Sequence, residues 1–147
     1  MLLRPLTGPV RDAALAVGRI LLGVVLVAHG WQKVFDYGFA GTTQAMVKMG
    51  VPLPPVSAAY ASFVELLGGT LLILGALTTV VSVLVVLDMI GAAIFSGSLH
   101  TVFAQNGGWE LVGVIGVGAL LLAAAGAGRF SVDHVLAGHR ATSPVSA

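Results

Sequence analysis

Hydrophobic residues fill four long stretches of the chain, and polar residues gather in the shorter segments between them. The apolar stretches run at about residues 14–34, 56–77, 79–96 and 110–126. A helix of roughly 20 apolar residues spans the hydrocarbon core of a bilayer, and about 17 is the lower limit. The pattern therefore predicts an all-α, polytopic membrane protein built as a bundle of four transmembrane helices.

Glycine and proline mark the ends of these helices. The pair Pro54 and Pro55 suits the start of the second helix, and Gly126 suits the end of the fourth. Between the first two spans, several glycines and prolines exclude one long helix. The segment at about residues 39–50 is expected to form either a short helix at the membrane interface or an irregular loop.

The composition favours lipid as the solvent. Only 9% of the 147 residues are charged and 57% are hydrophobic, whereas a soluble domain is about a quarter charged. Four spans use up nearly the whole chain, so residues 1–147 are expected to form one domain with short polar tails at 1–13 and 134–147. Ser131 or Asp133 is expected to cap one last amphipathic turn.

Net charge and cysteine content exclude several functions. The formal net charge of +1 provides no surface for nucleic acid. The chain has no cysteine, which excludes thiolate nucleophiles and iron–sulfur clusters held by this chain alone.

The distribution of basic residues predicts the orientation. Four spans place both termini on one side of the membrane, and positive residues mark the cytoplasmic side. The terminal side carries four arginines against two lysines on the other side: Arg4, Arg11, Arg129 and Arg140, against Lys33 and Lys48. Both termini are therefore expected in the cytoplasm.

Six charged or titratable residues lie within or at the ends of the spans: Arg19, His29, Lys33, Glu65, Asp88 and Glu110. A charge at the bilayer centre costs about 3 kcal/mol even on lenient scales, so such side chains usually turn inward and pair. At a helical rise of about 1.5 Å per residue, Glu65 and Asp88 each lie about 14 Å from a membrane face. Most of the set is expected to converge in the outer half of the membrane above Asp88: His29, Lys33, Glu65, Glu110 and the loop residue His100.

Two interpretations of this cluster stay open. In the first, the charges are structural ion pairs, such as Glu65 with Lys33 or Arg19 with Asp88. In the second, they line an outward-opening polar pocket, to which Gln32 also contributes, and this pocket binds a small molecule and moves protons. No spacing of ligands supports a metal site, so none is predicted.

Five short motifs occur in order along most of the chain. They are Arg19–Phe35 with His29-Gly30-Trp31-Gln32-Lys33 inside it, Met49-Gly50-Val51-Pro52, Glu65–Gly75, Gly107-Gly108-Trp109-Glu110 and Gly126–Asp133. In this order they resemble the DoxX family of small four-helix bacterial membrane proteins.

The resemblance implies a bundle in the bacterial cytoplasmic membrane and a link to redox chemistry. We therefore expect a membrane subunit of a redox or detoxification system that binds a quinone or a similar small molecule and has no covalently bound cofactor. The expected partners are membrane lipid, proteins of a redox complex and further copies of the chain. The candidate catalytic residues are His29, Glu65 and Glu110, and the candidate substrate-binding residues are Gln32, Lys33, His100 and Asp88.

Two other functions fit the same sequence, so whether the protein is an enzyme stays open. It could be a non-enzymatic membrane anchor or scaffold for soluble oxidative-stress enzymes, in which the buried charges only fix the packing of the helices. It could also be a small transporter component, although four spans without an evident inverted repeat argue against transport by one copy.

Overall fold

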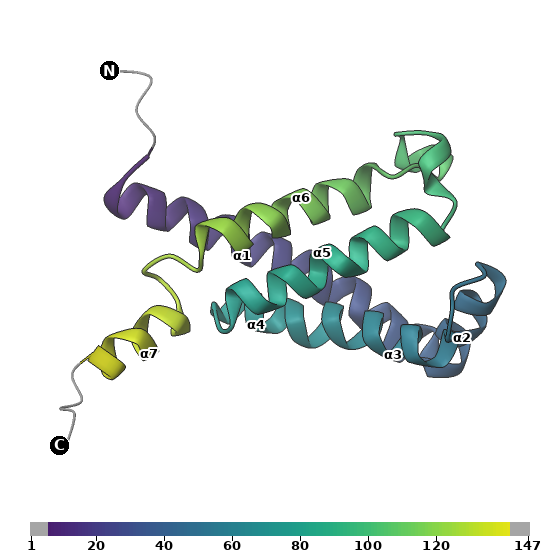
Figure 1. The fold of residues 1–147 in the computed structure, drawn as a ribbon, viewed down its shortest axis with the longest axis horizontal. Coiled ribbons are helices and arrows are strands. Elements are labelled where there is room, and N and C mark those ends of the chain that lie inside the picture. The colour runs from purple at the N-terminus through teal and green to yellow at the C-terminus, as the bar shows by residue number, and fades with distance from the viewer. Residues whose placement is uncertain (1–5, 142–147) are drawn as a thin grey trace.

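In a computed structural model, which describes residues 6–141, the chain forms helices and no strands over that range (Figure 1). The long helical segments follow the order α1 (Gly8–Trp31) with the π-helical turn η1 (Gln32–Asp36), α3 (Pro54–Phe63) with the π-helical turn η2 (Val64–Gly68) and α4 (Gly69–Leu74), α5 (Thr78–Phe95), and α6 (Glu110–Ala125). Shorter elements join or follow them: α2 (Gly38–Lys48), the 3-10 turns η3 (Ser98–His100) and η4 (Ala104–Asn106), and α7 (Val132–Ala141).

The predicted four-helix bundle is confirmed, and its fourth helix is the shortest. Three segments are long and apolar enough to cross a membrane, namely residues 8–36, 54–74 and 78–95. The fourth, α6, is apolar but has 16 residues. At about 1.5 Å per residue it is roughly 24 Å long, a few ångströms less than the hydrocarbon core.

The helices extend further than the apolar pattern predicts at both ends of the chain. α1 begins at Gly8, inside the predicted tail of residues 1–13, because Pro9 suits the first turn of a helix. The predicted short segment at 39–50 is helical and forms α2. Residues 1–5 and 142–147 of the predicted tails lie outside the described residues.

The bundle has two distinct ends (Figure 1). The start of α1, the turn between α4 and α5, and α7 lie at one end, which we call the terminal end. The helix α2 and the connection between α5 and α6 lie at the other, which we call the loop end. This arrangement places both ends of the described chain on the same side of the bundle.

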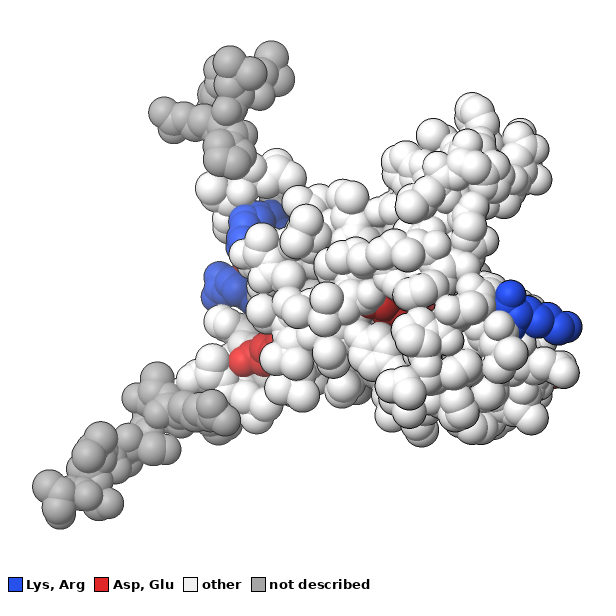
Figure 2. Space-filling model, turned by 45° about the vertical axis from the view of Figure 1, so that its right-hand side comes forward, with Lys and Arg blue, Asp and Glu red and all other residues white. Residues whose placement is uncertain are grey.

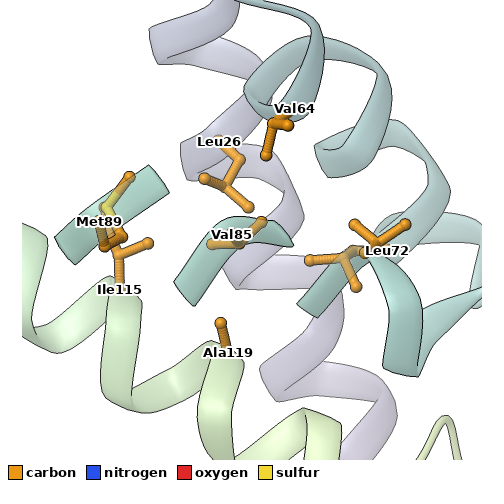
Figure 3. Close-up of a cluster of buried hydrophobic side chains, with 8 residues drawn as sticks. Leu26, Val64, Leu72, Val85, Met89, Ile115 and Ala119 are labelled. Atoms are coloured by element: carbon orange, nitrogen blue, oxygen red, sulfur yellow. The ribbon is translucent and has the colours of Figure 1, made fainter. Parts of the chain in front are cut away.

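A small apolar core joins all four long segments (Figure 3). Its labelled members come from α1, η2, α4, α5 and α6: Leu26, Val64, Leu72, Val85, Met89, Ile115 and Ala119. Many leucine, isoleucine and valine side chains point outward instead, such as Val114 with 72% exposure. An apolar exterior around a compact core is expected when lipid is the solvent.

Glycines let α1 approach the α3–α4 segment closely. A Cβ atom added at Gly30 would lie 2.8 Å from the Leu66 Cα atom, and one added at Gly69 would lie 2.8 Å from the Gly23 carbonyl oxygen. Such close backbone approach supplies much of the attraction between helices in a membrane. It also fixes the relative position of the two π-helical turns.

Arg19 ties the terminal end together. Its side chain is 2% exposed and donates to the backbone carbonyls of Leu72, of Ile73 at 2.8 Å and of Phe130 at 2.7 Å. The expectation that Arg19 pairs with Asp88 is therefore wrong. The guanidinium group instead binds carbonyls at the end of α4, where an α-helix runs out of internal N–H donors. Of these, the Leu72 carbonyl also accepts the Gly75 N–H at 3.1 Å.

Two capping interactions hold α7 against the same end. Ser131 accepts the backbone N–H of His134 at 3.2 Å, so Ser131 is the cap of α7. The carboxylate of Asp133 instead accepts the backbone N–H groups of Leu77 and Thr78 at 2.7 and 2.9 Å. Asp133 therefore caps the start of α5, an element distant in the sequence.

Candidate functional site

An ion pair joins the two π-helical turns. The Lys33 Nζ atom in η1 lies 2.5 Å from the Glu65 Oε2 atom in η2. The Glu65 side chain is 7% exposed and the Lys33 side chain 23%. Of the two ion pairs that the sequence suggests, the structure contains this one. π-helical turns are frequent at functional sites, so the two turns mark the region around this pair as a candidate site.

The π-helical geometry of η1 decides where Lys33 points. The Tyr37 N–H donates to the Gln32 carbonyl at 2.9 Å, five residues back, so the turn is wider than an α-helical turn. The Thr42 hydroxyl donates to the Lys33 carbonyl at 2.8 Å and thereby attaches α2 to this turn. The site thus depends on local backbone geometry as well as on the charges.

Asp88 on α5 supplies a second carboxylate beside this pair. The residue is 8% exposed, and its Oδ2 atom is buried without a hydrogen-bond partner among the described residues. Asp88 lies close enough to Glu65 and Lys33 to interact with both electrostatically. Buried polar atoms nearly always have a partner, so an orphaned carboxylate oxygen requires an explanation.

These three charged residues line one cavity, which we call the charged pocket. Its volume is about 260 Å³. Most of the remaining lining is apolar and includes Met46, Met49, Leu87 and Phe95. Pockets for drug-sized ligands usually occupy roughly 300–1,000 Å³, so the charged pocket is suited to a small group rather than to a large molecule.

The charges of the pocket leave one carboxylate without a cationic partner. Lys33 offers one positive charge, and Glu65 already lies in contact with it. Asp88 can therefore accept a hydrogen bond when it is ionised and donate one when it is protonated. Figure 2 shows acidic atoms partly hidden between uncharged atoms near the middle of the molecule, with further acidic atoms toward the left and basic residues toward both ends.

The structure brings together three of the seven site residues that the sequence suggests. Lys33, Glu65 and Asp88 line the charged pocket, whereas the other four do not: His29, Gln32, His100 and Glu110. The charged pocket therefore contains three of the predicted residues, and the other four lie outside its lining.

Local geometry explains why the four lie elsewhere. A spacing of four residues puts two side chains on one face of an α-helix. The π-helical turn η1 begins between His29 and Lys33, so this rule does not hold for them. The Gln32 side chain is exposed. His100 is exposed in the η3 turn, where its Nδ1 atom lies 2.6 Å from the Gly97 carbonyl oxygen. Glu110 begins α6 at the loop end.

Sequence patterns gave few signals for the remaining lining residues. Tyr60 comes five residues before Glu65 on the same helical segment, and its aromatic ring among small residues is the only hint of a pocket there. Met46 near the end of α2 and Met49 directly after it both line the pocket, which is consistent with a helix that covers a cavity. Within the described part of the chain, no three His, Asp or Glu side chains are grouped as a metal site.

Comparisons with known proteins give a consistent result. The family model described as DoxX matches residues 14–98, a range that contains every residue lining the charged pocket. The inner membrane protein YphA of Escherichia coli is 30% identical over 132 residues, which cover 86% of this chain and 92% of YphA. The inner membrane protein YqjF of the same organism is 33% identical over 132 residues, with 85% and 93% covered.

A third relative carries a functional name. CatD of Bacillus subtilis, whose name assigns it provisionally to the oxidoreductases, is 37% identical over 76 residues, which cover 52% of this chain and 54% of CatD. No solved structure matches the chain.

Proposed function

The chain belongs to the DoxX family of multi-pass proteins of the cytoplasmic membrane, and we propose that it is a membrane subunit of a redox or detoxification system that binds a quinone or similar headgroup in the charged pocket. One observation carries this proposal. The Oδ2 atom of Asp88 is buried without a partner beside the Lys33–Glu65 ion pair, in a cavity of about 260 Å³. A bound headgroup would supply the missing hydrogen bond.

The three charged residues have different roles in this proposal. A quinone carbonyl needs a hydrogen-bond donor and a quinol hydroxyl also offers one, and a carboxyl group can serve either form by changing its protonation state. Asp88 is the residue that would exchange the proton. Lys33 would stabilise the anion of a partly reduced headgroup, and Glu65 would hold Lys33 in position.

The remaining parts of the system would lie outside this chain. An electron donor, either a partner protein or a thiol-type compound, would have to reach the headgroup. With both termini in the cytoplasm, as the arginine distribution predicts, the pocket would lie in the half of the membrane that faces away from the cytoplasm. The oxidoreductase name of CatD supports the redox assignment at the level of the family.

Quinone binding to the purified protein in lipid nanodiscs tests the proposal. Asp88→Ala removes both the donor and the acceptor of this side chain, and is expected to weaken binding of decylubiquinone by about tenfold, the value of one hydrogen bond. Glu110→Ala removes a carboxylate outside the pocket and should change affinity by less than about twofold. Equal affinities of the wild type and Asp88→Ala, or no binding by the wild type, would refute the proposal and favour the scaffold function.

A further inference from the structure

The charged pocket opens through the side of the bundle. Leu87 lines the pocket and is nevertheless 55% exposed, although it lies in the middle of the membrane-spanning helix α5. Gly91, one helical turn further on, also lines the pocket, and a Cβ atom placed there would meet no heavy atom within 4 Å. The gap beside Leu87 and Gly91 therefore faces the surrounding lipid.

Contacts on either side define this opening. Toward the terminal end, the Tyr60 hydroxyl donates to the Leu84 carbonyl at 2.8 Å and joins α3 to α5. Toward the loop end, Met46 and Met49 of the α2 region cover the pocket.

From this geometry we propose that the natural ligand is an uncharged amphiphile that enters from the bilayer, with its headgroup against Asp88 and its hydrocarbon tail passing Leu87 and Gly91 into the lipid. The proposal rests on the proposed function for the place of the headgroup and adds the class of ligand and its route. A cavity of about 260 Å³ holds a headgroup but not a long tail, and the apolar opening gives the tail a place outside.

The charges of the pocket disfavour an anionic phospholipid. Its phosphate would lie beside the Glu65 carboxylate and the Asp88 carboxyl group, and Lys33 is the one basic residue among those that line the pocket. A zwitterionic headgroup, which carries its own cation, would have to fit a phosphate and an ammonium group into a cavity of about 260 Å³. Like charges in a site shielded from water repel strongly. An uncharged headgroup with a hydroxyl or carbonyl oxygen avoids this repulsion and still satisfies Asp88.

Photo-crosslinking of the full chain in nanodiscs tests the inference with a probe that is not a quinone. A long-chain alcohol with a diazirine near its hydroxyl is expected to label pocket residues such as Tyr60 and Phe95. Gly91→Leu would fill the opening without a steric clash of its Cβ atom and should reduce this labelling by about tenfold. Gly18→Leu is the matched control, because Gly18 is also helical and free of atoms within 4 Å of an added Cβ, and lies outside the pocket.

The outcomes separate this inference from the proposed function. Labelling of the pocket that Gly91→Leu abolishes and Gly18→Leu retains would support lateral entry. Labelling no stronger than that of a photoreactive phosphatidylcholine, or unchanged in Gly91→Leu, would overturn it. Competition by decylubiquinone tests the proposed function separately: labelling that decylubiquinone does not reduce would keep the amphiphile and remove the quinone.

Discussion

The Lys33 Nζ atom lies 2.5 Å from the Glu65 Oε2 atom, and each of the two residues is in a π-helical turn. The turn η1 follows α1 directly and η2 separates α3 from α4, next to glycines that bring these segments into close contact. The ion pair is thus set by two local departures from α-helical geometry that face each other. This relationship makes the pair both a structural link between the helices and a wall of the charged pocket.

Breaking the ion pair on one side is expected to destabilise the bundle more than removing it entirely. Glu65→Gln leaves the Lys33 ammonium group without its anion in a low-dielectric site, at a cost of about 3 kcal/mol. The double variant Lys33→Met with Glu65→Met should recover most of this loss, because neither charge of the ion pair is left without its partner. Unfolding in mixed micelles, followed by circular dichroism, measures the two free energies, and a double variant as unstable as Glu65→Gln would contradict the expectation.

The close approach of α1 to η2 is expected to forbid any side chain at Gly30. A Cβ atom there would lie 2.8 Å from both the Cα and the Cβ atom of Leu66, so Gly30→Ala must push the helices apart and cost about 2 kcal/mol. Gly18→Ala is the control, since its Cβ would meet no atom within 4 Å. It should be neutral or stabilising by up to about 1 kcal/mol. The same unfolding measurement compares them, and equal stabilities would show that the contact is easily relieved.

The geometry of Arg19 is expected to require a guanidinium group. Two of its nitrogen atoms donate to three carbonyl oxygens on two separate segments, and the single nitrogen of a lysine has no such fork. Arg19→Lys should therefore lower stability by about 2 kcal/mol through unsatisfied buried carbonyls. Arg11→Lys alters an exposed arginine with one carbonyl bond of 3.3 Å and should change little. A stable Arg19→Lys protein would mean that water can replace the fork.

Much of the fold was predictable because lipid imposes a simple rule on the sequence. Apolar stretches of sufficient length predicted the four helices, and Gly126 ends α6 with a φ of 75° as glycine is expected to. The cost of a charge in lipid also predicted that Lys33, Glu65 and Asp88 turn inward. All three line the charged pocket, with Glu65 and Asp88 buried and Lys33 partly exposed.

The partners of these charges were harder to predict, for physical reasons. Helical spacing placed His29 beside Lys33, but the π-helical turn that separates them has no clear sequence signal. Arg19 binds backbone carbonyls, which every residue carries, so the side-chain pattern could not identify its partners. Asp12, in the predicted polar tail, is 5% exposed and accepts the Arg129 N–H at 3.3 Å, a contact that only the folded chain creates.

The cap that Asp133 provides for α5 is expected to make stability depend on pH below the neutral range. Burial alone would raise the pKa of Asp133, but the N–H groups of Thr78 and Leu77, together with the charge of Arg19, hold it below its ordinary value of 3.8. The folded protein therefore binds this proton less readily than the unfolded chain. The contribution of the cap to the free energy of unfolding is complete above about pH 4 and is lost as the pH falls through the lowered pKa.

Asp133→Ala should lower the free energy of unfolding by about 1 kcal/mol at neutral pH, and this gap to the wild type should narrow toward pH 3. Asp133→Asn keeps one acceptor without the charge, so it should cost less than Asp133→Ala at neutral pH. Its gap to the wild type should narrow over the same pH range, because only the wild type titrates at this position. Unfolding of the three proteins across this pH range measures the gaps, and a constant gap for Asp133→Ala would show that the charge of the carboxylate contributes nothing.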